Sequence, residues 1–122
     1  MIALRIKRIY ESPASTDGCR VLVDRLWPRG LSKERAAIDH WMRDLAPSDA
    51  LRTWYQHDAA KWEEFQQRYF RELIDNPSMV QELVDLCAAG PVTLLYASRE
   101  SELNNAAALR DYLRKRLNDL VG

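Results

Sequence analysis

The sequence contains few of the residues from which metal sites and catalytic motifs are most often built. It has two histidines, His40 and His57, and two cysteines, Cys19 and Cys87, which form no C-x-x-C pair. Two histidines are too few for a histidine-rich metal site, and nothing in the cysteine spacing calls for a disulfide, although the sequence alone leaves one open. With four glycines, the chain has no glycine-rich phosphate loop, no G-x-S-x-G elbow and no H-E-x-x-H motif. We therefore expect no metal and no cofactor.

Long apolar runs are also missing. No segment approaches the about 20 consecutive apolar residues of a membrane-spanning helix, and the N-terminal residues form no signal-peptide pattern. With 122 residues, 47% hydrophobic and 30% charged, the chain is typical of one globular domain over residues 1–122, which buries about 65% of the surface of its unfolded chain. We expect a cytoplasmic protein that does not bind membranes.

An excess of charge of one sign is absent too, since 18 basic residues balance 18 acidic ones. This balance argues against a protein devoted to coating nucleic acid. The distribution is uneven, because residues 1–35 hold eight Lys/Arg against four acids. Fourteen of the basic residues are arginines and four are lysines. Arginine is the better bidentate partner for carboxylate and phosphate, although a compositional bias of the source genome explains the same ratio.

Residues 18–32 form the stretch around which the chain is organised. Val21–Val23 is a short apolar, β-branched run bounded by a glycine and charges, which predicts a buried strand. Asp24 and Arg25 follow at its carboxyl end. The turn Trp27-Pro28-Arg29-Gly30 then stops the strand, because proline fixes φ and has no N–H to donate.

The other elements follow from periodicity and capping residues. Ile2, Leu4 and Ile6 alternate with polar residues, which predicts a half-exposed edge strand. The loop over 12–18 is too short for a helical crossover, so the first two strands are antiparallel neighbours or are not adjacent. Helices are predicted over 33–37, after the capping residue Ser48, and over 59–74, 77–89 and 103–120. An amphipathic turn is predicted over 38–45 and a buried strand over 92–97. Cys87 and Leu120 lie on apolar helix faces and are expected to be buried.

Two buried strands separated by helices are most simply parallel and joined by a right-handed crossover. We therefore predict an α/β fold, a single-domain layer sandwich with a small, mainly parallel sheet packed by helices. Ligands of such sheets bind outside the carboxyl ends of the strands. Those ends carry Asp24, Arg25 and Arg29 after one strand, and Ser98 and Arg99 after the other.

Each candidate site residue has a structural alternative. Asp24 and His57 are the candidate acid–base groups. His57 precedes the residue expected to cap a helix, where anions are attracted, and histidine is a residue type suited to general acid–base catalysis. Asp24 equally suits an ion pair with Arg25 that orients a loop, and His57 suits a capping loop. Arg29, between proline and glycine, suits a rigid turn that presents a cation to an anionic ligand. Arg99 is either a clamp or a solvated charge.

Cys19-x5-Arg25 has the cysteine–arginine spacing of protein tyrosine phosphatases. That chemistry needs the intervening residues to curl so that their N–H groups face phosphate. Here those residues form the predicted strand and their N–H groups belong to its ladder. The spacing therefore does not indicate a phosphatase.

The whole chain resembles the YeaO-like group of the domain-of-unknown-function family 488. The matching residues are Asp17-Gly18 with Arg20–Gly30, then Ala46-Pro47-Ser48 with Leu51-Arg52, His57-Asp58, Phe65-x-x-x-Tyr69 and Leu94-Leu95-Tyr96. The resemblance implies a small bacterial cytosolic protein and no established activity. Members commonly read Asn-His-Ala where this chain reads Asn104-Asn105-Ala106, and an amide cannot replace a titrating histidine.

Two functional hypotheses follow. In the first, the protein is a small-molecule enzyme or binder in which Arg25, Arg29 and Arg99 hold a phosphate or carboxylate, with Ser98 beside them and Asn104 orienting the ligand. In the second, which we rank lower, it binds nucleic acid or a protein partner through its basic N-terminal third and Trp27.

Overall fold

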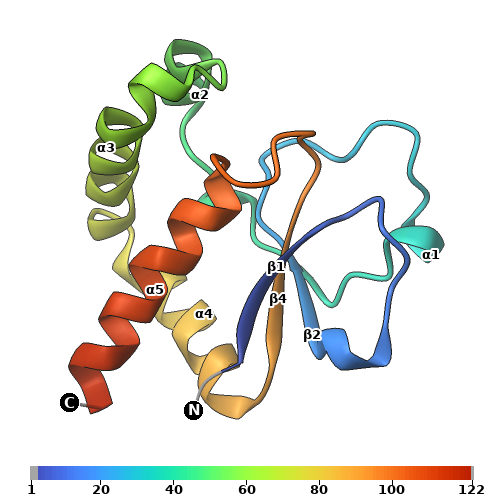
Figure 1. Cartoon of the computed structure of the whole chain (residues 1–122). Helices are drawn as coiled ribbons and strands as arrows, with labels where there is room; N and C mark the ends of the chain where they lie inside the picture. Colours follow the sequence, from blue (N-terminus) through green and yellow to red (C-terminus); the bar gives the residue numbers. More distant parts are fainter. Residues whose placement is uncertain (1–2, 122) are drawn as a thin grey trace.

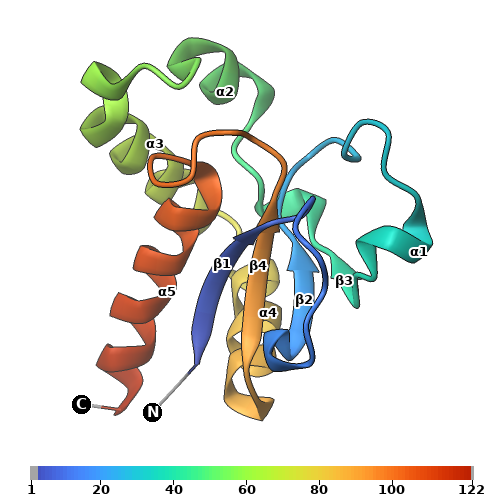
Figure 2. The same cartoon turned by 45° about the vertical axis from the view of Figure 1, so that its right-hand side comes forward.

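A four-stranded parallel sheet forms the centre of the computed structural model, which describes residues 3–121, with side chains through residue 118. The strands are β1 (Leu4–Arg8), β2 (Cys19–Leu22), β3 (His40–Trp41) and β4 (Val92–Tyr96), in the spatial order β1-β4-β2-β3. Every pair of neighbouring strands is parallel. The predicted α/β fold is therefore confirmed, and β1 lies at an edge as expected (Figures 1 and 2).

β1 and β2 are not adjacent, because β4 lies between them. Of the two alternatives that the loop length left open, this is the one observed. Residues 9–18 return from the carboxyl edge of the sheet to its amino edge with no α-helix, only a short 3-10 turn at Ser15–Asp17. The backbone N–H of Ile9 donates to Tyr96 O (2.8 Å), and that of Cys19 donates to Pro91 O (2.9 Å), so both ends of this connection are held by residues of β4 or next to it.

Helices lie on both faces of the sheet, but unequally. They are α1 (Lys33–Ala36), α2 (Asp49–Tyr55), α3 (Trp62–Ile74), α4 (Pro77–Ala89) and α5 (Asn105–Val121). Figures 1 and 2 show α2 to α5 on one side of the strands and α1 with its loops on the other. None of the helices within residues 3–121 has the length and apolarity needed to cross a membrane.

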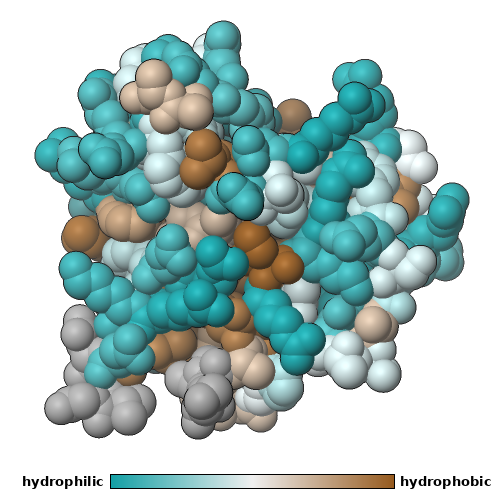
Figure 3. Space-filling view, in the orientation of Figure 1, coloured by the Kyte–Doolittle hydropathy of each residue, from teal (hydrophilic) through white to brown (hydrophobic). Residues whose placement is uncertain are grey.

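The strands of the centre are buried on both faces, because successive side chains alternate between two hydrophobic clusters. Val21, Val23 and Leu94 pack with α2 to α5 in the larger cluster. Leu22 and Leu95 pack on the other side with Trp27 and Trp41. Most of the surface seen in Figure 3 is hydrophilic, and hydrophobic side chains show there only in small, separate areas.

Three of the four residues that the sequence offers as helix caps, Ser32, Ser48 and Asp58, make cap hydrogen bonds, whereas the side chain of Asn76 before α4 makes none. Ser32 accepts from Arg35 N at the start of α1, and Ser48 accepts from Leu51 N at the start of α2. Asp58 accepts from Ala60 N at a 3-10 turn (Ala59–Lys61) that leads into α3. Cys87 is buried in α4 and both cysteines are free thiols, whereas Ile2 and the side chain of Leu120 lie outside the described residues.

The prediction for residues 38–45 was wrong. They form β3 and a 3-10 turn (Arg43–Leu45) rather than an amphipathic helical turn. The backbone N–H groups of Asp39 and Met42 donate to Arg20 O and Leu22 O, at 2.8 and 2.9 Å. Pairing with the open edge of β2 thus decides the local structure. Smaller shifts occur at β2, which spans 19–22 rather than 21–23, and at α5, which begins at Asn105 rather than Leu103.

Candidate functional site

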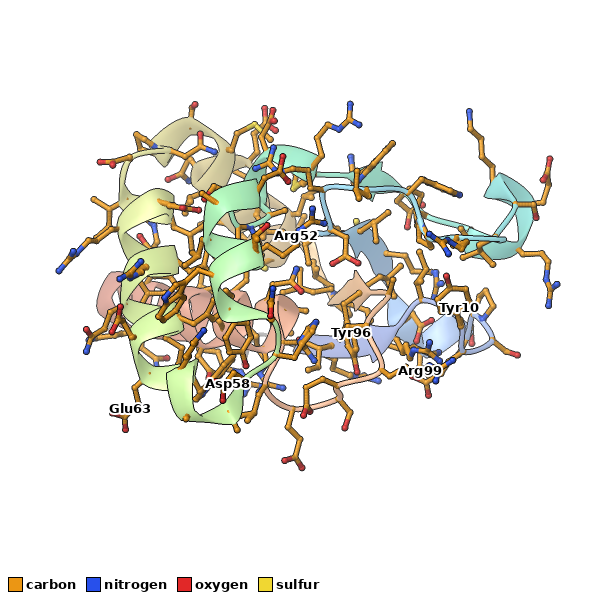
Figure 4. The ribbon with its side chains drawn as sticks, turned by 90° about the horizontal axis from the view of Figure 1, so that it is seen from above. Tyr10, Arg52, Asp58, Glu63, Tyr96 and Arg99 are labelled. Atoms are coloured by element: carbon orange, nitrogen blue, oxygen red, sulfur yellow. The ribbon has the colours of Figure 1, made fainter. Side chains whose placement is uncertain are left out.

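A pocket of about 380 Å³ opens at the carboxyl edge of the sheet. Figure 4 looks down on this edge, with Arg52 of α2 and Tyr10 of the β1–β2 connection on different sides of it. Aromatic and aliphatic side chains supply much of the lining, among them Trp27, Tyr55 and Phe65. Its polar lining residues are Tyr10, Asp24, Arg25, Arg29, Arg52, His57, Ser98 and Asn105. The volume falls within the range typical of small-molecule sites.

The segments that follow β2 and β4 lie side by side at this edge. Val23 N donates to Leu95 O (3.1 Å), and Ala97 N donates to Asp24 Oδ2 (2.8 Å). The two strands run in the same direction, as the sequence predicted. This juxtaposition brings Asp24 and Ser98, 74 positions apart, into one pocket.

Asp24 is fixed by neighbours on three segments. Its Oδ1 accepts from Asn105 Nδ2 (3.1 Å), its Oδ2 accepts from Ala97 N, and its backbone carbonyl accepts from Trp41 Nε1 (2.8 Å). Burial raises the pKa of Asp24, and the hydrogen bonds from Ala97 and Asn105 oppose that rise without cancelling it. The carboxyl group is therefore held in one position and is costly to ionise.

Three arginines line the same pocket. The Arg25 guanidinium donates to the carbonyls of Ala46 (3.3 Å) and Pro47 (3.4 Å). Arg52, with a side chain 49% exposed, donates to Asp49 Oδ1 at 3.2 Å, and Arg25 Nε lies 4.0 Å from the same oxygen. Asp49 has a side chain 72% exposed and is not a lining residue. Because exposed ion pairs contribute little, Asp49 leaves most of this positive charge available to a ligand.

Arg29 is exposed on a loop that its neighbours hold in place. Tyr10 Oη donates to the Arg29 carbonyl (2.8 Å), and Trp27 Nε1 donates to the Leu31 carbonyl (2.6 Å). The Trp27 ring packs edge-on against Trp41, with 5.4 Å between centroids. The loop thus has few conformations to lose when its arginine binds a ligand.

His57 lines the pocket from the segment after α2. It is exposed and its backbone has φ of +56°, next to Gln56 at +46°, a region that residues other than glycine rarely adopt. Its ring centroid lies 5.6 Å from that of Tyr55. The next residue, Asp58, caps the 3-10 turn, so His57 combines the pocket position and the capping-loop position that the sequence offered as alternatives.

Two of the residues predicted from sequence are not in the pocket lining. Asn104 is fully buried and serves as the cap of α5, since its Oδ1 accepts from Ala107 N (2.9 Å) and its Nδ2 donates to Glu100 O (2.7 Å). Arg99 is exposed and is not a lining residue. The other predicted residues do meet in the pocket; the acid–base roles of Asp24 and His57 and the ligand-binding roles of Arg25, Arg29 and Ser98 remain predictions.

Sequence reasoning assigned no role to Tyr10, Arg52, Tyr55 or Asn105, which also line the pocket. Arg52 stands in one of the segments on which the family resemblance rests, and Asn105 stands where that resemblance implies a histidine. The family resemblance was therefore the signal in the sequence that could have marked Arg52 and Asn105 as lining residues of the pocket. Tyr10 follows β1 at the same edge of the sheet, but no motif marks it.

The basic N-terminal third is partly used inside the protein. Lys7 Nζ and Arg20 Nη1 both donate to the Asp17 carboxylate, and Arg8 Nε donates to the carbonyls of Ala97 and Ser98. Cys19 begins β2 at the opposite edge of the sheet from the pocket, and burial raises the pKa of its thiol. The geometry agrees with the rejection of a phosphatase loop. Within the described residues, no three histidine, cysteine or acidic side chains are placed to hold a metal ion.

Comparisons with known proteins place the chain in a family. The family described as "Inactive DUF488-N3 subclade" matches residues 3–121. The chain is 36% identical over 111 residues to the uncharacterized protein YeaO of Escherichia coli, covering 91% of this chain and 96% of that protein. It is 40% identical over 113 residues to the uncharacterized proteins Mb3100c of Mycobacterium bovis and Rv3073c of Mycobacterium tuberculosis, covering 93% of this chain and 95% of each. No solved structure matches significantly. The chain therefore belongs to the YeaO-like proteins of the DUF488 family.

Proposed function

We propose that this protein binds a small ligand carrying a phosphate or carboxylate group in the pocket at the carboxyl edge of its sheet, and that it acts as a binder rather than a catalyst. The observation that carries the proposal is the lining of one pocket by Arg25, Arg29 and Arg52 with a single carboxylate, Asp24. The pocket therefore has a net positive charge. Guanidinium groups are the side chains best suited to bidentate recognition of such anions.

The three arginines differ in how free they are to bind. Arg25 is directed by the Ala46 and Pro47 carbonyls, so it supplies charge from a fixed position. Arg29 makes no side-chain hydrogen bond or ion pair among the described residues, while Arg52 makes one exposed pair with Asp49. We therefore assign Arg29 and Arg52 the direct contacts with the anion, and Arg25 the supporting charge.

The titratable groups of the pocket are poorly arranged for proton transfer. Both Asp24 oxygens already accept hydrogen bonds, and Asn105 is an amide that does not titrate. Tyr55 Oη donates to Leu103 O (2.8 Å), and burial raises the pKa of Tyr55 to about 12. The described residues provide no hydrogen bond that orients the His57 ring, which a catalytic base ordinarily needs. The word "inactive" in the family description agrees with a binding role.

The alternative, a nucleic-acid or protein-binding surface on the basic N-terminal third, has less support. Three of the basic residues in that segment, Lys7, Arg8 and Arg20, are hydrogen-bonded inside the protein. Those side chains are therefore not free to contact phosphates. Affinity for single-stranded oligonucleotides that falls steeply with salt would favour this alternative over the pocket.

Isothermal titration calorimetry with inorganic phosphate, phenyl phosphate and 4-methylbenzoate tests the proposal. We expect at least one of these anions to bind. Arg52→Ala and Arg29→Ala should each weaken it by about tenfold or more, since a hydrogen bond to a charged group contributes about 1.5–3 kcal/mol. Arg35→Ala, which removes an exposed arginine of α1 outside the pocket, is the matched control and should bind as the wild type does. Absence of binding by all three anions, or equal affinity of the Arg52→Ala and Arg29→Ala variants and the wild type, contradicts the proposal.

A further inference from the structure

The carboxylate of Asp24 pairs with none of the arginines that line its pocket. Among the described residues, the arginines of the pocket form ion pairs only with Asp49. No arginine or lysine nitrogen of the described residues lies within 4.0 Å of the Asp24 carboxylate oxygens. Arg25 and Arg52 both approach Asp49, next to the Ala46 and Pro47 carbonyls, whereas Asp24 is held by Ala97 and Asn105. The positive and negative groups are therefore anchored to different segments around one cavity.

Asn105 adds a second acceptor beside Asp24. Its Nδ2 donates to Val23 O (3.0 Å) and to Asp24 Oδ1 (3.1 Å), which uses both hydrogens of the amide. The oxygen left over, Asn105 Oδ1, accepts no hydrogen bond from the described residues. Each Asp24 oxygen accepts one protein hydrogen bond and has capacity for another. We call Asp24 and Asn105 the acceptor pair.

We infer that the ligand is bipolar, with an anionic group bound by the arginines and an ammonium or other cationic N–H donor bound by the acceptor pair. This inference rests on the proposed function and specifies its ligand class. Both amide hydrogens of Asn105 are already donated within the protein, so an anion placed against the acceptor pair would find no free donor there and would be repelled by the Asp24 carboxylate. A cationic donor supplies what the pocket lacks there, a counter-charge for a partly buried carboxylate. Burial raises the pKa of Asp24, so its ionised form is disfavoured in the free protein, and a cationic donor placed against the carboxylate would offset that cost.

The rest of the lining suits a compact body between the two charged ends. Trp27, Tyr55 and Phe65 line the pocket, and the Tyr55 and Phe65 rings are stacked with centroids 4.2 Å apart. A benzene-sized ligand needs about 150 Å³. A cavity of about 380 Å³ therefore holds one ring with a substituent at each end.

The test compares ligands that differ only in the donor group. The rigid pair is 4-(aminomethyl)benzoate and 4-methylbenzoate, and the flexible pair, which adapts to a different span, is 6-aminohexanoate and hexanoate. We expect the bipolar member of at least one pair to bind about tenfold more tightly than its amine-free partner in calorimetry with the wild-type protein. Asp24→Asn should remove that advantage while leaving the affinity for the amine-free acid equal or higher, because the repulsion is removed.

Arg35→Ala is again the matched control, and the unfolding midpoint of each variant shows whether it is folded. The wild-type comparison needs no variant, so a failure of Asp24→Asn to fold does not remove the test. If the amine-free acids bind in an Arg52-dependent way and neither bipolar ligand binds more tightly, the inference is wrong and the proposed function stands. If no carboxylic acid binds, with or without an amine, the inference is wrong, and the proposed function is wrong as well unless inorganic phosphate or phenyl phosphate binds.

Discussion

Replacing Arg20 with methionine should destabilise the protein strongly, because it breaks a buried ion pair. Arg20 is 4% exposed and Asp17 is 5% exposed. The Arg20 guanidinium donates to the Asp17 carboxylate and to the carbonyls of Ala36 (2.9 Å) and Ala37 (3.1 Å). It thus joins the β1–β2 connection to the end of α1. Methionine keeps much of the apolar volume and removes all of these donors.

The magnitude follows from what remains around Asp17. Removing one partner of a buried ion pair typically costs about 3–5 kcal/mol. Lys7 Nζ still donates to Asp17 at 3.1 Å, and its side chain is 19% exposed, so part of the charge stays compensated. We therefore expect a loss near the lower end, about 3 kcal/mol. With a urea m-value of about 1–3 kcal/mol/M, the unfolding midpoint falls by about 1–3 M.

The pH dependence of that loss separates charge from packing. Burial opposes ionisation of Asp17, but the hydrogen bonds from Ala14, Lys7 and Arg20 outweigh it and lower its pKa below the ordinary 3.8. A lowered folded-state pKa stabilises the protein above the unfolded-state pKa, and this stability is lost as pH falls through the folded-state value. Without Arg20 the pKa of Asp17 rises. The difference in unfolding free energy between the wild type and Arg20→Met should therefore be largest near pH 7 and become smaller below about pH 4.

Urea unfolding followed by tryptophan fluorescence at pH 7, 4 and 3 measures both effects. Arg35→Met, at an exposed arginine of α1, is the matched control and should change the unfolding free energy by less than about 0.5 kcal/mol. A loss below about 1 kcal/mol for Arg20→Met at pH 7 would refute the assignment of a buried, stabilising pair. A loss that stays constant from pH 7 to pH 3 would refute its electrostatic origin.

Of three further predictions, the first concerns the amino edge of the sheet and the other two concern the frame of the pocket. Gly18→Ala should cost about 2 kcal/mol or more in urea unfolding, because Gly18 has φ of +64° and an added Cβ would lie 2.4 Å from Pro91 O. Asn104→Ala should cost about 2 kcal/mol by loss of the buried cap of α5, whereas the same change at exposed Asn118 should be nearly silent in the same assay. Trp27→Phe removes the hydrogen bond to Leu31 O that helps to hold the loop of Arg29. Phosphate affinity measured by calorimetry should therefore fall several-fold, while the free energy of unfolding falls by only about 1 kcal/mol. Unchanged affinity would show that this hydrogen bond does not position Arg29.

The sequence predicted best those elements whose signal lies within the element. β4 is a continuous apolar run and is buried on both faces, and α3 shows its buried stripe of Phe65, Tyr69 and Leu73 at steps of four. The sequence-based prediction missed β3 because its two residues are held in an extended conformation by pairing with β2 and not by a local pattern. Within residues 38–45, the spacing of apolar side chains fits a helical turn as well as it fits the observed strand and 3-10 turn. No local pattern distinguishes the two.

The candidate site was predictable to the level of the edge of the sheet, and not to the level of individual side chains. Asp24 was placed correctly because it follows a strand. Whether a polar residue after a strand faces the pocket depends on its tertiary hydrogen bonds, and these separate Asn105 from its neighbour Asn104. Asn104 turns inward to cap α5, and Asn105 reaches across to Asp24. Two identical residues in succession give the sequence no basis for that choice.

The position of the pocket follows from the order of the strands. β2 and β4 are neighbours, but the chain leaves β2 toward α1 on one face of the sheet and leaves β4 toward α5 on the other (Figures 1 and 2). Such a divergence opens a crevice at the carboxyl ends of parallel strands. Asp24 belongs to the frame of this crevice, because its carboxylate binds Ala97 N at the end of β4. Arg29 and Arg52 stand on a loop and a short helix that the strands do not need for pairing, so substitutions at these two positions should change which anion binds while leaving the sheet intact.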